Sequence, residues 1–364
     1  GEWNAYTSNA DTTFVIEAPA KNQRKALDLL LALLTQTRID DNAINVAKQV
    51  VEREDGGHYS HLQRWLDRQD LGHTASNQLA VELGLKCQER AEVSHLTREQ
   101  LEKVRKAWYA PNNMTLIVVG ELDRLLPAYL ERAYGALVAV EPADHLPLPT
   151  IQASAAHERT LSHGFVGGGA KLHWLVPEPV QEDQPDETFD LLKDYLDWAL
   201  YRQLRLVHGL SYGPSAEREV FGGVGFMSLN ADLERGDVPA AEQVLDELKA
   251  GLLKDGLDAT TFARLKQAAI ARQAWAVQGN SALADYYWSA LGDYEDGHFT
   301  NPAKALQEVT LAEANQAMRE LLLQPGYLRI EKPLVSYDQL MWAIAGVFGL
   351  MVLGALGWRV HRRK

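Results

Sequence analysis

The chain has 364 residues, which is enough for about two domains with hydrophobic cores of their own. Acidic residues outnumber basic ones by 49 to 36, so the net charge is −13. No Lys/Arg-dense stretch with interleaved aromatic residues occurs, and both features argue against a nucleic-acid-binding protein. The charge favours solubility and neutral or basic peptide substrates. The single cysteine, Cys87, excludes an intrachain disulfide and a Cys-rich zinc site.

The first half of the chain predicts a mixture of helices and strands. An alternating run at 12–16 predicts a strand that follows a turn at 4–7. Thr97, with Gln100 three residues later and apolar residues at helical spacing, is typical of a helix start. The apolar run 115–120 predicts a buried strand. Helices are expected at 22–37, at 44–53, from 97 onward and at 125–134.

The second half predicts a comparable order of elements. A stretch with Pro142, Pro147 and Pro149 separates the two halves and is typical of a linker. Strands are expected at 171–176, 222–231 and 327–330, and helices at 187–207, 238–253, 259–278 and 311–323. Both halves therefore belong to the α+β class.

The C-terminal segment predicts a membrane anchor. The run 340–358 is apolar and uncharged, and it is about as long as a helix that crosses a bilayer. Trp342 and Trp358 lie near its ends, where amphipathic rings prefer the interface. The basic tail 359–364 follows at once, so the positive-inside rule makes the tail cytoplasmic and leaves the preceding chain on the outer, periplasmic face. A buried core helix is the alternative, which the lack of charge and the basic end disfavour.

Three segments carry a resemblance to a known family. They are Gly-Glu-Trp-Asn-Ala-Tyr-Thr-Ser at 1–8, Val-Val-Glu-Arg-Glu at 50–54 and Arg-Leu-Val-His-Gly-Leu-Ser-Tyr at 205–212. Together they resemble the pitrilysin/insulinase family of zinc metallopeptidases, which carry an inverted H-x-x-E-H motif. The resemblance covers roughly residues 1–330. It implies two similar α/β-sandwich halves that form a clamshell around a peptide chamber.

The resemblance also implies that a part of the family pattern is absent. No H-x-x-E-H occurs in the sequence, so the chain is expected to be N-terminally truncated and inactive alone. The implied organisation is the remainder of an N-terminal peptidase-like domain without its first strand and H-x-x-E-H helix (1–139), a linker (140–160), a C-terminal peptidase-like domain (161–333), a transmembrane helix (340–358) and the basic tail (359–364).

The cofactor that the resemblance implies is Zn²⁺, with Glu54 as a ligand. A catalytic zinc takes three protein ligands and keeps one position open for water. In the family, H-x-x-E-H supplies two histidines and the third ligand is a downstream glutamate, to which Glu54 corresponds. Glu52 stays an alternative because the register is uncertain by two residues. Ala47 stands where many members have an acidic residue.

Two other interpretations of this region stay open. Without the resemblance, Glu52 and Glu54 are solvated helix charges. A self-contained site of His58, His61 and Glu54 is geometrically conceivable because positions three apart share a helix face. The glycines at 56–57 interrupt the helix between these residues, which favours a surface loop instead.

The resemblance implies two substrate-binding residues, Asn4 and Ala5, and two catalytic residues, Arg205 and Tyr212. Asn4 and Ala5 correspond to an edge strand that pairs with the substrate backbone, although an ordinary strand pair explains them equally. Arg205 and Tyr212 correspond to an Arg–Tyr pair of the second domain. A phenol hydroxyl can donate to the oxyanion of the reacting carbonyl, and a guanidinium can bind substrate carbonyls or position the tyrosine. The alternative is a helix-end arginine beside a packed tyrosine.

Two functions follow as expectations. The first is a membrane-anchored zinc metalloendopeptidase that cleaves peptides or unfolded polypeptides. The second is a non-catalytic membrane-tethered family member that binds peptides or serves as a scaffold or partner subunit. A homodimer, or a heterodimer with a related peptidase subunit, is a further expectation, and no nucleic-acid partner is expected.

Overall fold

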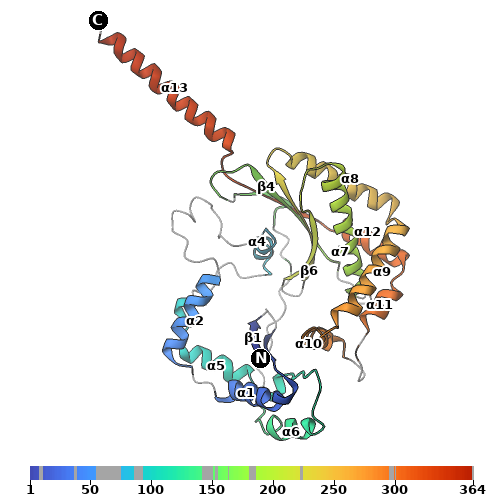
Figure 1. Cartoon of the computed structure of the whole chain (residues 1–364). Coiled ribbons are helices and arrows are strands. Elements are labelled where there is room, and N and C mark those ends of the chain that lie inside the picture. The colour runs from blue at the N-terminus through green and yellow to red at the C-terminus, as the bar shows by residue number, and fades with distance from the viewer. Residues whose placement is uncertain are drawn as a thin grey trace. The chain divides into compact units, whose positions relative to one another are not determined.

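The computed structural model describes residues 1–7, 11–36, 39–54, 75–85, 93–141, 151, 155–162, 164–179, 186–221, 224–294, 299 and 301–362. The chain divides into two compact units, each discontinuous in sequence (Figure 1). The first unit comprises Gly1–Gly57, Gln88–Leu148 and Lys266–Glu308. The second unit comprises His58–Cys87, Pro149–Leu265 and Val309–Lys364.

The first unit contains a two-stranded antiparallel hairpin of β1 (Glu2–Thr7) and β2 (Thr12–Glu17). Its helices are α1 (Gln23–Gln36), α2 (Asp41–Glu54), α5 (Arg98–Trp108), α6 (Leu126–Ala133), α10 (Asn280–Ser289) and α11 (Pro302–Glu308). Short 3₁₀ turns lie at Ala20–Asn22, Val93–His95, Pro111–Asn113 and Ala290–Asp293. The four helices predicted in the first half are confirmed, whereas the predicted turn at 4–7 is wrong because these residues belong to β1 itself.

The N-terminus of α5 shows why that helix could be predicted locally. Thr97 Oγ1 accepts a hydrogen bond from the Gln100 amide at 3.3 Å, and Gln100 Oε1 accepts one from the Thr97 amide at 2.8 Å. This capping box satisfies two backbone donors that the helix itself leaves without partners.

The buried strand predicted at 115–120 is wrong. This segment forms no ladder with any strand in the described part of the chain. Its apolar side chains are half-buried or exposed, and Leu116 is 36% exposed. β-propensity measures how well a residue fits a paired, half-covered surface, and here the pairing is missing.

The second unit is built on a five-stranded sheet of order β3-β7-β4-β6-β5. The strands are β3 (Glu158–Ser162), β4 (Gly169–Pro177), β5 (Ser215–Phe221), β6 (Val224–Glu234) and β7 (Tyr327–Lys332). Neighbours are antiparallel except β3 and β7, which are parallel. The predictions of β4, β6 and β7 are confirmed. The two edge strands, β3 and β5, were not predicted because their sequences are short and largely polar.

The helices of the second unit are α4 (Ala75–Glu82), α7 (Asp186–Leu200), α8 (Val238–Asp255), α12 (Leu311–Leu323) and α13 (Tyr337–His361). α9 (Ala259–Ala276) begins in this unit and ends in the first. A π-helix, η4 (Tyr201–Val207), continues α7. The helix predicted at 187–207 is therefore confirmed in position, but its last seven residues are wound as a π-helix, a rare form that often occurs at functional sites.

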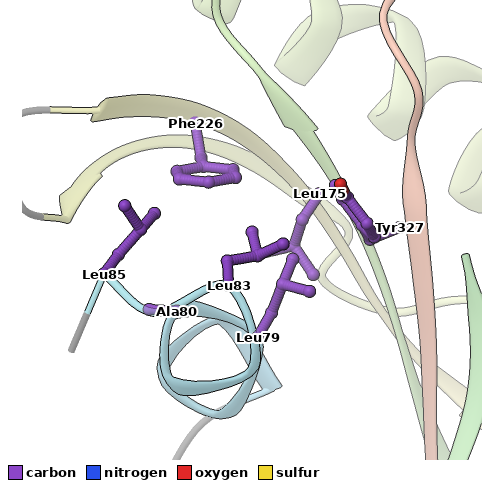
Figure 2. Packing of buried hydrophobic residues seen from close by; sticks show 7 residues of the cluster. All are labelled: Leu79, Ala80, Leu83, Leu85, Leu175, Phe226 and Tyr327. Atoms are coloured by element: carbon purple, nitrogen blue, oxygen red, sulfur yellow. The ribbon is translucent and has the colours of Figure 1, made fainter. Parts of the chain in front are cut away.

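The sheet is covered on both faces. α7, α8 and α12 lie on one side and α4 on the other (Figure 1). Figure 2 shows how Leu79 of α4 and Leu83, which directly follows the helix, point toward the strands. They pack in one cluster with Ala80, Leu85, Leu175, Phe226 and Tyr327, all at most 7% exposed.

An ion pair adds to this anchorage of α4. Glu82, at the end of the helix, accepts a hydrogen bond from Arg329 Nη2 at 2.8 Å and also pairs with Arg159. Arg329 is fully buried on β7, and its Nη1 donates to the Ala156 carbonyl at 2.9 Å. Burial lowers the pKa of Arg329 more than the nearby Glu82 carboxylate raises it.

α13 contains the segment predicted to be a membrane anchor. Tyr337–Leu356 is long and apolar enough to cross a membrane by length and composition, and none of it is buried within the protein. The helix starts at a capping box in which the Gln339 amide donates to Ser336 Oγ and the Ser336 amide to Gln339 Oε1. At the other end, the Arg362 guanidinium lies 4.0 Å from the centroid of the Trp358 ring.

Candidate functional site

The structure brings Arg205 and Tyr212 into contact in the second unit. Arg205 Nη1 donates to the Tyr212 carbonyl oxygen at 2.8 Å, and its guanidinium carbon lies 4.2 Å from the centroid of the Tyr212 ring. The Tyr212 side chain is 81% exposed. The arrangement is a cation–π pair tied by a backbone hydrogen bond, with the phenol turned to solvent.

The turn after the π-helix accounts for this proximity. The amides of Leu210 and Ser211 both donate to the carbonyl of Leu204, at 2.7 and 3.2 Å. Gly209 has a φ of +64°, a left-handed conformation that glycine adopts without steric cost. Leu204 is fully buried and fixes the π-helix to the core. The chain therefore reverses direction after the π-helix, and this turn brings Tyr212 into contact with Arg205.

The electrostatic environment of Arg205 differs from that of a structural arginine. Arg218 on β5 donates to both oxygens of Glu178, at 2.8 and 2.9 Å, and to Asp190 at 2.7 Å. Burial lowers the pKa of Arg218, but the bonds to these two carboxylates outweigh it and raise the pKa. Arg205 has no carboxylate within ion-pair distance among the described residues. Its remaining N–H donors can therefore serve a ligand.

Tyr201 is a third member of the cluster that the sequence analysis missed. Its ring centroid lies 5.0 Å from the Arg205 guanidinium carbon. The spacing of four residues along a helix, which brings side chains together, was the available indication. Arg205 thus contacts two phenol rings.

Asn4 and Ala5 lie in β1, opposite Val15 and Phe14 of β2. All six residues of β1 are exposed, and the Asn4 side chain accepts a hydrogen bond from the Ala5 amide at 2.9 Å. Within the described residues β1 pairs only with β2, so its other edge is available for strand addition. The substrate-binding role of the two residues stays a prediction.

The predicted metal ligands lie where the structure does not describe side chains. Glu54 is the last residue of α2, and its side chain, like that of Glu52, lies outside what the structure describes. His58, His61 and His73 also lie outside the described residues. In the part of the chain that is described, no three His, Cys, Asp or Glu side chains could hold a metal ion together. Because none of the candidate ligands has a described side chain, the assignment of Glu54 stays a prediction.

Comparison with known proteins shows which family these features resemble. A family model described as the peptidase M16 inactive domain matches residues 95–269, which include the Arg205–Tyr212 pair. The resemblance to the insulinase-like M16 peptidases is confirmed. No curated protein matches the sequence.

Solved structures of M16 proteins share the fold. The periplasmic protease PqqL from Escherichia coli is 18% identical with a TM-score of 0.65, over 91% of this chain and 39% of that one. A peptidase M16 inactive domain from Pseudomonas fluorescens is 17% identical with a TM-score of 0.68, over 92% of this chain and 81% of that one. A protease from Helicobacter pylori is 16% identical with a TM-score of 0.69, over 91% and 82% of the two chains. This chain thus spans 39% of PqqL, and at these identities the likeness establishes the M16-type mixed α/β fold.

Proposed function

We propose that this chain provides the peptide-binding part of a membrane-anchored M16 zinc metalloendopeptidase that cleaves peptides or unfolded polypeptides. The observation that carries the proposal is the Arg205–Tyr212 pair, with a fixed guanidinium and an exposed phenol. The zinc chemistry belongs to an H-x-x-E-H segment that this sequence does not contain. The chain by itself is therefore expected to bind peptides without cleaving them.

The two side chains suit the carbonyl groups of an extended peptide. The guanidinium presents donors in a planar fork, and the Tyr212 hydroxyl is a further donor. The bond from Arg205 to the Tyr212 backbone carbonyl restrains the guanidinium before a ligand arrives, which lowers the entropic cost of binding. Donors aimed in advance at a carbonyl oxygen would also stabilise an oxyanion that develops there.

A non-catalytic partner subunit is the second candidate. The match to the inactive domain of the family favours it. In this case the chain would bind peptides as a scaffold, or pair with a second copy or a related peptidase subunit. Both candidates require peptide binding through Arg205 and Tyr212, and they differ in whether a complete protein hydrolyses the peptide.

The proposed location rests on α13. Its apolar length supports a single membrane span, and the basic end after Trp358 supports a cytoplasmic C-terminus. The bulk of the chain would then lie on the periplasmic face. The periplasmic location of PqqL supports this assignment.

The test is binding of a fluorescently labelled unstructured peptide to the full chain in detergent micelles, followed by anisotropy. Arg205→Ala is expected to weaken binding about tenfold, because a hydrogen bond to a charged donor is worth about 1.5–3 kcal/mol. Arg202→Ala is the matched control, since Arg202 is an exposed arginine of the same π-helix. It is expected to leave the affinity within about twofold.

The same samples decide the catalytic question. We expect no hydrolysis of the peptide after addition of Zn²⁺. Hydrolysis that disappears in Arg205→Ala would show that the chain alone is a peptidase. Equal affinities of the wild type and Arg205→Ala would refute the proposed binding site.

A further inference from the structure

We propose that Tyr201 is a positioning residue that holds the Arg205 guanidinium in the orientation in which it receives a peptide carbonyl. The inference rests on the proposed peptide-binding function of Arg205 and Tyr212. It assigns to the pair a third member, which acts on the ligand only through Arg205.

The backbone explains why Tyr201 and Arg205 meet. They are the first and fifth residues of the π-helix. This winding closes each turn with i→i+5 bonds, as between the His208 amide and the Gln203 carbonyl at 3.1 Å, so that residues four and five apart lie on one side. Tyr201 therefore stands over the same side of the helix as Arg205, and its ring lies 5.0 Å from the guanidinium carbon.

The rings of Tyr201 and Tyr212 and the Tyr212 carbonyl together restrict the orientation of the Arg205 guanidinium. Tyr212 contributes its ring face and its backbone carbonyl, but it lies on a turn and is 81% exposed. Tyr201 instead extends from a helix that is fixed at both flanks by Leu200 and Leu204, which are 1% and 0% exposed. It is the more rigid of the two ring contacts. An arginine side chain without a carboxylate partner needs such contacts to keep one rotamer.

Packing does not account for Tyr201. The ring is 39% exposed, whereas the neighbouring leucines bury the helix against the core. A tyrosine needed only for the core would be buried, with its hydroxyl bonded to a partner. The ring face, rather than the hydroxyl, is the part that contacts Arg205. Phenylalanine should therefore replace Tyr201 without loss, and leucine, which also suits a helix, should not.

The experiment uses the full chain in detergent micelles and four variants: Tyr201→Phe, Tyr201→Leu, Arg205→Ala and the double variant Tyr201→Leu/Arg205→Ala. The first readout needs no ligand. A 1,2-dicarbonyl reagent modifies arginine side chains, and mass spectrometry follows the rate at Arg205 and, as an internal reference, at Arg202. A cation–π contact at an exposed site corresponds to about a two- to fivefold factor, so Tyr201→Leu should accelerate the reaction at Arg205 by about that amount. Tyr201→Phe should not.

The second readout is the affinity for the labelled peptide. Tyr201→Leu is expected to weaken binding about two- to fivefold in the wild-type background and to have no effect in the Arg205→Ala background. A merely structural role would weaken binding in both backgrounds and would lower the thermal unfolding temperature.

Each result has a separate meaning. Unchanged reactivity of Arg205 in Tyr201→Leu overturns the positioning role, whatever the peptide does. Failure of the wild type to bind peptide overturns the proposed function, while the reactivity of Arg205 still tests its contact with Tyr201. Faster reaction at Arg205 in Tyr201→Leu together with an unchanged peptide affinity would show that the contact exists but has no role in binding.

Discussion

The two units contain similar sequence elements but complete their sheets to different degrees. The second unit has a five-stranded sheet covered on both faces, and its central strand β4 has three residues at most 2% exposed. The hairpin of the first unit has two strands without a single buried residue. A two-stranded hairpin is marginally stable by itself, whereas a larger sheet packed against helices forms an independent core. The difference therefore lies in the available partners rather than in the residues.

Two apolar runs show this directly. The run 171–176 forms the centre of the sheet as part of β4, and Leu172 in it is 1% exposed. The run 115–120 has equally strong β-forming residues but stays unpaired within the described residues, and Leu116 in it is 36% exposed. Strand formation is thus decided by tertiary contacts that a local pattern does not contain.

The largest expected difference concerns buried and exposed arginines. Arg329→Gln should destabilise the second unit by about 3–5 kcal/mol, because it leaves Glu82 and the Ala156 carbonyl without their buried donor. Arg98→Gln should cost the first unit less than about 1 kcal/mol, since the pair of Arg98 with Asp41 is exposed. Hydrogen exchange with mass spectrometry, read for peptides of each unit, measures both changes. Equal effects of the two variants would contradict the difference between the units.

A second pair of variants compares the two apolar runs. Leu172→Ala is expected to cost about 2–5 kcal/mol because it opens a cavity in a packed core. Leu116→Ala should cost less than about 1 kcal/mol, because part of this side chain is already in water. Urea titration of hydrogen exchange in the peptides that contain each residue gives the two values. A loss above about 2 kcal/mol for Leu116→Ala would mean that 115–120 has a packing partner.

The capping boxes of α5 and α12 allow a comparison in which the capping residue is a threonine in both cases. Thr97→Ala and Thr310→Ala should each cost about 1 kcal/mol, since both remove a side-chain acceptor at a helix start. The two variants should differ in how far increased hydrogen exchange extends beyond the helix that loses its cap. α12 buries five residues in the core, so Thr310→Ala should raise exchange throughout the second unit. α5 has no buried residue, so the effect of Thr97→Ala should stay within that helix.

Features that depend on local sequence could be predicted, whereas features that depend on tertiary contacts could not. Local chemistry was enough for the Thr97 cap and for α12, and an apolar run was enough for β4. The edge strands β3 and β5 were missed because their own sequences are short and largely polar, so that they depend on pairing with a neighbouring strand. The attachment of α4 to the sheet was missed because Glu82 and Arg329 are 247 residues apart. At the candidate site, the resemblance predicted Arg205 and Tyr212, but the contact with Tyr201 depends on the winding of the helix.

The smallest expected effect is a pH dependence confined to the sheet of the second unit. His173 on β4 lies with Nδ1 2.7 Å from Asn230 Oδ1 and with Nε2 3.5 Å from Glu331 Oε1. Burial lowers the pKa of His173 and the charge of Lys171 lowers it slightly, but the contacts with Glu331 and Asn230 outweigh both, so the pKa is raised.

A raised folded-state pKa fixes the sign of this effect. The protonated form is favoured by folding, so its contribution is fully present below the unfolded-state pKa of about 6.5 and is lost as the pH rises through the folded-state pKa. Protection of β4 and β7 amides, corrected for the intrinsic exchange rate, should therefore decrease in the wild type as the pH rises from about 6.5 through the folded-state pKa. His173→Gln should remove this decrease, and Lys171→Met should move it to higher pH. A decrease of the same size in His173→Gln would mean that another group titrates. Protonation of His173 would then not stabilise the contact between β4 and β7.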